Sequence, residues 1–305
     1  MRKNATGWIM CQLQQTTGYQ QIDRILSGAI HVYETVFMGR ISGCYLSGSY
    51  ADRTASADSD INLIVVFKGE VNADEHAHFN TISEGLLQIG DVTFNAALYA
   101  EAALLTSAPT QLKIALFLYG EDKRDRYPLE KLDQYIQRTM ANAFCHIQGL
   151  RQHETDLKAP LGYPDPEDIF FGYIDQRPDA SFPVCPLVST VTMMASTLTG
   201  IQTRRQAGSK QQAVMLYREF VDDDWIGFIE DVYRTLKLRW LCAIPKDKDD
   251  QQHLRTLCQW MLGFENYFLR ACWPHLSQNL QHEAPAVRRN AEKTLHTIAY
   301  SSDLL

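Results

Sequence analysis

The chain has 305 residues and a formal net charge of −7, with 45% hydrophobic and 21% charged residues. This composition is typical of a folded globular protein and excludes a collagen-like or largely disordered chain. The negative charge and the lack of a polybasic run argue against a nucleic-acid polymer as partner. No apolar run approaches the ~20 residues of a spanning helix, which argues against a membrane.

The first 125 residues alternate between helical and strand patterns. Apolar residues recur at helical intervals over 21–38, and Gly39 can end the predicted helix. A second amphipathic segment, 74–88, indicates another helix. Three short apolar runs are typical of buried strands: 41–48, 61–67 and 93–99. We therefore expect an α/β domain with a small mixed sheet over residues 1–125.

From residue 129 onward the hydrophobic periodicity is helical almost throughout. The exception is a stretch rich in Pro, Gly and Asp, 160–183, within a loop-rich crossover that we place at 153–185. Apolar stripes over 229–240 and 254–268 favour a helical bundle core. The expected fold class is therefore α+β, with an all-helical second domain over residues 126–305.

The seven cysteines are scattered, without a CxxC pair or the spacing of a zinc site. The apolar patch near the N-terminus is too short for the core of a signal peptide. Both observations favour reduced thiols and a location in the cytoplasm.

Polar residues cluster around the second predicted strand. Alternate strand residues share a face, so Asp60 and Asn62 should project to the same side. The Gly48-Ser49 pair lies just before them, where glycine permits close approach to a phosphate and serine offers a hydroxyl. Asp91 opens the next predicted strand and can add a third oxygen ligand. Such oxygen ligands, completed by substrate phosphates, suit Mg²⁺.

The stretch GSYADRTASADSDINL, followed by GDVTFNAAL, resembles the nucleotidyltransferase superfamily with a polymerase-β type head. The shared pattern is Gly-Ser, a spacer, Asp-x-Asp and a later acid on another strand. LYGED at 118–122 is similar to the strand end that follows the third acid in such heads. The helical C-terminal half, with TGIQTRRQAGSKQQAVMLY at 199–217, resembles that of the aminoglycoside adenylyltransferases.

The resemblance implies Mg²⁺-dependent transfer of a nucleoside monophosphate from ATP or another nucleoside triphosphate to a hydroxyl of a small molecule. Antibiotic resistance is one setting for such a reaction. Asp91 would accept the proton of the attacking hydroxyl, and Asp60 would be the second catalytic acid. The implied metal ligands are Asp60, Asn62 and Asp91. The implied nucleotide contacts are Gly48, Ser49, Ser59 and Lys210.

Two residues depart from the family pattern. Asn62 stands in place of the second metal acid, and Arg53 stands where many members have a glycine. An amide can ligate Mg²⁺ but brings no charge, although Asp58 could compensate if the strand began early. One alternative is therefore a degenerate member that binds a nucleotide or a partner without turnover. Another is a helical interaction protein with a vestigial head.

Other residues have structural interpretations as well. Asp60 can be a surface aspartate and Asp91 a turn residue. Lys210 can simply follow Ser209, the cap of a helix, and be solvated. The acidic run 222–224 is typical of a helix cap and first turn, where the helix dipole favours negative charge.

Overall fold

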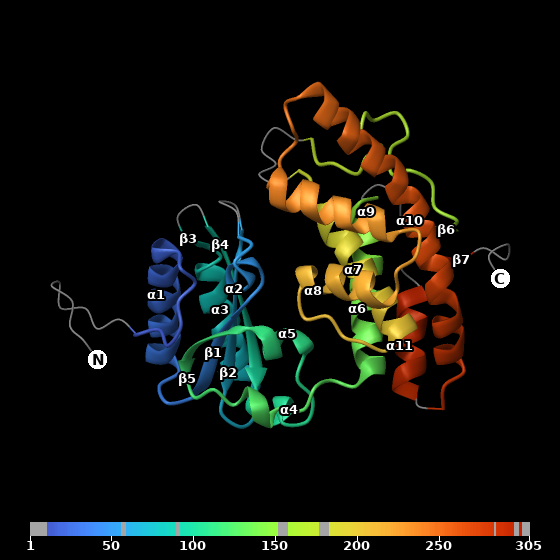
Figure 1. Cartoon of the computed structure of the whole chain (residues 1–305). Helices are drawn as coiled ribbons and strands as arrows, with labels where there is room; N and C mark the ends of the chain where they lie inside the picture. The colour runs from blue at the N-terminus through green and yellow to red at the C-terminus, as the bar shows by residue number, and fades with distance from the viewer. Residues whose placement is uncertain are drawn as a thin grey trace. The chain divides into compact units, whose positions relative to one another are not determined.

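The computed structural model describes residues 11–55, 59–89, 92–151, 158–176, 183–283, 285–295 and 299–300. The chain divides into two compact units, Met1–Glu130 and Lys131–Leu305. We call them the N-terminal unit and the helical unit and describe each by itself (Figure 1). None of the helices in the described part of the chain is long and apolar enough to cross a membrane.

The N-terminal unit contains one sheet and several helices. Its helices are α1 (Gln20–Val36), α2 (Ser49–Asp52), α3 (Ala73–Gly85), α4 (Glu101–Leu104), α5 (Thr110–Ile114) and the 3₁₀ helix η1 (Arg124–Arg126). Its strands are β1 (Ile41–Ser47), β2 (Ile61–Phe67), β3 (Gln88–Ile89), β4 (Val92–Ala100) and β5 (Leu116–Gly120). The expected strand at 61–67 is confirmed, and the expected strand at 93–99 lies within β4.

The sheet is mixed, as expected from the sequence. Its strand order is β3-β4-β2-β1-β5. β1 runs antiparallel to both β2 and β5, whereas β2 and β4 are parallel. β2 is therefore an interior strand whose two neighbours run in opposite directions.

Local signals explain where the helices begin and end. The Asn72 side chain accepts from the Glu75 backbone N–H at 2.8 Å, and the Glu75 carboxylate accepts from the Asn72 N–H at 3.1 Å. This reciprocal capping box starts α3. After α1, Gly39 has a φ of 72°, a conformation that favours glycine, and the chain turns there into β1.

Both faces of the sheet are covered by helices (Figure 1). Side chains of α1 and α3 pack on one face, and side chains of α4 and α5 pack on part of the other. Because strand residues alternate between faces, β2 divides its side chains between two cores. The first core receives Ile61, Leu63, Val65 and Phe67. The second receives Ile64 and Val66.

The helical unit consists mainly of long helices. They are α6 (Leu132–Gly149), α7 (Cys185–Thr203), α8 (Lys210–Phe220), α9 (Ile226–Asp231), the π-helix η2 (Val232–Arg239), α10 (Lys248–Leu280) and α11 (Pro285–Leu295). The expectation of a purely helical second part needs one correction. β6 (Lys158–Ala159) and β7 (Ala299–Tyr300) form a short parallel pair, since these extended segments can satisfy each other's backbone groups.

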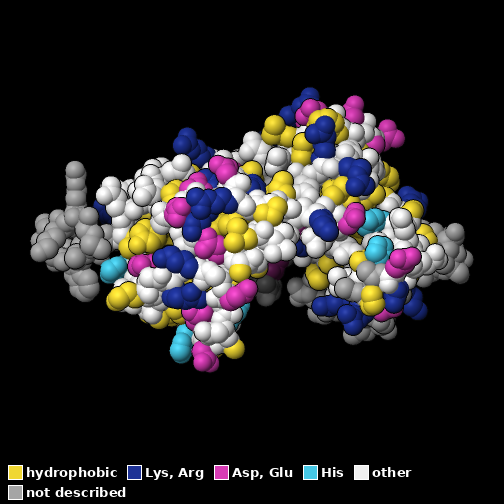
Figure 2. All heavy atoms as spheres, turned by 90° about the horizontal axis from the view of Figure 1, so that it is seen from below, with side chains coloured by type: hydrophobic (Ala, Val, Ile, Leu, Met, Phe, Trp, Pro, Cys, Tyr) yellow, Lys and Arg dark blue, Asp and Glu magenta, His cyan; other side chains and the backbone are white. Residues whose placement is uncertain are grey.

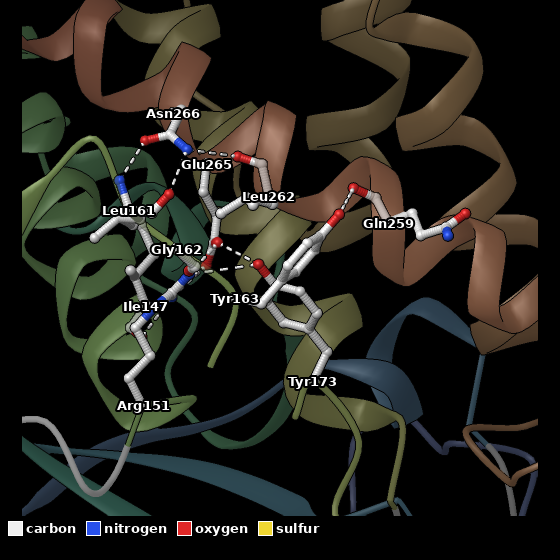
Figure 3. A network of polar contacts seen from close by, with 10 residues as sticks. All are labelled: Ile147, Arg151, Leu161, Gly162, Tyr163, Tyr173, Gln259, Leu262, Glu265 and Asn266. Carbon is white, nitrogen blue, oxygen red and sulfur yellow. Dashed lines mark hydrogen bonds and ion pairs between the residues drawn. The ribbon is translucent and has the colours of Figure 1, made fainter. Parts of the chain in front are cut away.

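A buried ion pair joins α10 to the end of α6 (Figure 3). Arg151 donates to both carboxylate oxygens of Glu265, at 2.8 and 2.6 Å, and the two side chains are 1% and 0% exposed. Tyr173 donates to the same carboxylate at 2.6 Å, and Arg151 also donates to the carbonyl of Gly162 at 3.0 Å. The network therefore ties the described loop 158–176 to two helices.

We predict that Arg151→Ala destabilises the helical unit by about 3–5 kcal/mol, because Glu265 is then a buried charge without its cation. The matched control is Arg218→Ala, whose partner Glu230 lies at 3.1 Å in a pair with a 61% exposed arginine. The control should change the stability by at most about 1 kcal/mol. Urea unfolding followed by tryptophan fluorescence measures both, because four of the five tryptophans lie in this unit: 225, 240, 260 and 273. Equal midpoints for the two variants would contradict the prediction.

Candidate functional site

The face of the sheet that packs into the second core also carries a row of polar side chains across three strands. Ser47 of β1 pairs with Asn62 of β2, and Asn62 pairs in parallel register with Asn95 of β4. Directly paired residues project to the same face. All three are half-buried. The next row on β1 and β2 is the pair Tyr45 and Ile64, which is buried in the second core. The polar row therefore lies at the edge of that core.

Asp60 lies one residue before β2 and is exposed. Its Oδ2 atom accepts a hydrogen bond from Nδ2 of Asn95 at 3.0 Å. This bond places the carboxylate over the same face as Asn95 and, through the register, as Asn62. The structure thus brings Asp60 and Asn62 together, and it adds Asn95 to them.

Asn95 was not among the residues singled out from the sequence. The alternating apolar residues Val92, Phe94, Ala96 and Leu98 mark one face of β4 and leave Asn95 on the other. That alternation alone predicts the face of the sheet to which the Asn95 side chain projects. Its place beside Asp60 depends on the pairing of β2 with β4, which the sequence does not specify.

Gly48 forms the turn between β1 and α2. Its φ is 82° and its ψ is −157°, a conformation available essentially only to glycine. A Cβ atom there would lie 3.2 Å from Nδ2 of Asn62. Ser49 follows as the first residue of α2. The Asn62 amide therefore lies beside Gly48, and a side chain at that position would crowd it.

Arg53 ends α2 with a φ of 58°. Most residues with a side chain avoid this left-handed conformation, whereas glycine adopts it at no steric cost. Arg53 therefore adopts this turn at a conformational cost.

The other residues expected at the site in the N-terminal unit are Ser59, Asp91 and Asp58. Ser59 is half-buried just before Asp60. Asp91 and Asp58 lie outside the described residues. The expected ligand set of Asp60, Asn62 and Asp91 therefore stays a prediction. Within the part of the chain that the structure describes, no group of three or more His, Cys, Asp and Glu side chains is arranged to hold a metal ion.

Lys210 belongs to the helical unit, where it is the first residue of α8. Ser209 caps this helix by accepting from the Gln212 N–H at 3.2 Å, so the capping interpretation of Ser209 is confirmed. The Lys210 ammonium donates to Oγ of Ser189 at 2.7 Å. Burial lowers the pKa of His146, and the charge of Lys210 lowers it further. A contact between Lys210 and a nucleotide stays a prediction.

The acidic run before Trp225 contains one engaged carboxylate. Asp223 accepts from the Trp225 N–H at 3.0 Å, which agrees with its expected role at a helix start. It also accepts from the hydroxyls of Tyr217 at 2.8 Å and Tyr267 at 2.6 Å. Burial and the Asp223 carboxylate both raise the pKa of Tyr217. These contacts give Asp223 a structural role.

Comparison of the sequence with models of known protein families gives no match, and no characterised protein with significant similarity is found. The case for a function is therefore made from the residues of the site.

We predict that Gly48→Ala destabilises the N-terminal unit by about 1–3 kcal/mol, because alanine is strained at this φ. The matched control is Gly28→Ala within α1, where an added Cβ meets nothing within 4 Å. The control should stabilise by about 0.5–1 kcal/mol, since alanine is the better helix former. Thermal unfolding followed by circular dichroism measures both variants. A Gly48→Ala protein as stable as Gly28→Ala would contradict the prediction.

Proposed function

We propose that the protein is a Mg²⁺-dependent nucleotidyltransferase that transfers a nucleoside monophosphate from ATP or another nucleoside triphosphate to a hydroxyl of a small molecule. The observation that carries the proposal is the place of Gly48, before Ser49, beside a polar row that includes Asn62 and borders Asp60. A glycine turn beside oxygen ligands at a strand end offers phosphate and cation neighbouring positions.

The described residues fit a Mg²⁺ ion in the chemistry of their donors. Asp60 supplies an exposed carboxylate, and Asn62 supplies a carboxamide on the same face. Mg²⁺ is usually held by one or two carboxylates together with substrate phosphates. When bound, the ion would polarise a phosphoryl oxygen and neutralise developing charge.

The chain's own residues have separate roles in this proposal. Gly48 and Ser49 bind the phosphates, with the turn allowing the close approach and the serine hydroxyl donating. Asn95 orients Asp60 through the 3.0 Å hydrogen bond. Asp91 accepts the proton of the attacking hydroxyl, as a general base does. Ser59, just before Asp60, completes the nucleotide contacts of this unit.

The charges on one face of the molecule bear on the kind of acceptor that we propose. On the face shown in Figure 2, Lys and Arg side chains are interspersed with Asp and Glu within each unit. A protein that follows a phosphate backbone presents clustered cations instead. The cysteines are free thiols, which suits the reducing cytoplasm that we propose as the location.

A second candidate is a degenerate nucleotidyltransferase that binds a nucleotide or a partner without turnover. The amide at Asn62 favours it, because Asn62 stands where the family pattern has the second metal acid. A unit charge 4 Å from another contributes about 4 kcal/mol at an effective dielectric constant of 20. Replacing an acid by an amide therefore weakens two-metal chemistry substantially.

We predict Mg²⁺-dependent binding of a nucleoside triphosphate, measured by calorimetry at millimolar nucleotide. Asp60→Ala should weaken the binding at least about tenfold, since it removes a carboxylate ligand. Asp74→Ala is the matched control, because Asp74 is an exposed acid in the first turn of α3. Absence of binding by the unchanged protein, with and without Mg²⁺, would remove the transferase and the nucleotide-binding form of the second candidate.

We predict that Asn62→Asp raises the rate of pyrophosphate release at least about tenfold, because the added carboxylate strengthens the site for cations. The measurement is a coupled pyrophosphate assay over a panel of nucleotides and hydroxylated acceptors. Good turnover by the unchanged protein would rule out the degenerate nucleotidyltransferase that binds without turnover. A large gain in Asn62→Asp over a silent parent would identify a degenerate site instead.

A further inference from the structure

Cys185 and Cys242 meet where the π-helix η2 is joined to the start of α7. Cys185 is the first residue of α7, and Cys242 lies in the turn after η2. The backbone N–H of Val184 donates to the carbonyl of Cys242 at 3.2 Å. A hydrogen bond between the two side chains contributes most to the raised pKa of the Cys242 thiol. Residues far apart in the sequence are thus neighbours at this junction.

The turn holds Cys242 in an uncommon conformation. Leu241 and Cys242 have φ values of 52° and 65°, which residues with side chains rarely adopt. The N–H of Cys242 donates to the carbonyl of Leu236 at 2.8 Å, so Cys242 is hydrogen-bonded on both sides. Strained backbone and π-helical turns concentrate at functional positions. The backbone therefore fixes the direction of the Cα–Cβ bond of Cys242.

The two thiols have different chemical roles. The hydrogen bond to Cys185, followed by burial, raises the pKa of the Cys242 thiol and so favours its protonated form. Cys242 is 4% exposed, whereas Cys185 is half-buried and can meet a small oxidant. Negative charge at Cys185 is favoured by the N-terminus of α7. Exposure and the helix start therefore favour Cys185 as the nucleophile of the pair.

We propose that Cys185 and Cys242 form a reversible redox site that closes into a disulfide when a hydroperoxide is present. The Cys185 thiolate attacks the peroxide oxygen, the O–O bond breaks, and a sulfenic acid forms. The Cys242 sulfur then attacks the Cys185 sulfur, the S–O bond breaks, and water leaves. In total, two thiols and one hydrogen peroxide give one disulfide and two waters. The disulfide links the turn after η2 to the start of α7.

The experiment treats the full chain with hydrogen peroxide at low protein concentration and counts thiols with a maleimide. The count should fall from the seven free cysteines to five, and dithiothreitol should restore it. Mass spectrometry after trypsin should show the peptide 240–246 joined to the peptide that contains Cys185. The oxidised protein should melt at least about 5 °C higher than the reduced protein, because the cross-link restricts the unfolded chain.

Two single variants separate this pair from general oxidation. Cys185→Ser removes the nucleophile and should abolish both the cross-linked peptide and the melting shift. Cys145→Ser removes an exposed cysteine and should leave both unchanged. The proposal is overturned if peroxide leaves seven thiols in the unchanged protein, if the disulfide joins other cysteines, or if Cys185→Ser retains the melting shift.

Discussion

The N-terminal unit depends on the burial of β2 on both of its faces. Ile61, Leu63 and Val65 fill one core while Ile64 and Val66 fill the other, so a shift by one residue would exchange the two sets. The same shift would turn Asn62 toward α1 and α3, where an amide would be costly. Packing of β2 in the two cores therefore determines the face to which the polar row projects.

The turn before β2 shows how backbone conformation and chemistry are joined. Two residues with positive φ, Gly48 and Arg53, frame the single turn of α2. A positive φ favours glycine, which is present at Gly48 but not at Arg53. Gly48 lies beside Asn62 although Arg53 is strained, and the proposed binding role of this turn rests on that arrangement. Whether the proposed function includes turnover depends on the amide at Asn62.

Periodicity located α1, β1, β2 and β4 within a few residues, because each segment buries one face or two and the pattern is local. It could not give the pairing of β2 with β4, and this is why Asn95 was missed. The conformation of Arg53 was also hidden, since it depends on how α2 ends. Glu265 lies in an apolar helical stripe, and nothing in that stripe indicates Arg151, which is distant in the sequence. The cap at Ser209 was visible because capping involves near neighbours.

The buried pair of Arg151 and Glu265 also has a consequence for how this chain can change over generations. Each side chain alone would be a charge in a dry interior, whereas two apolar side chains of similar volume can replace an ion pair at little cost. A lineage that lost one partner first would pass through an unstable form. The two positions should therefore be inherited together, and in divergent descendants they should change together or remain as they are.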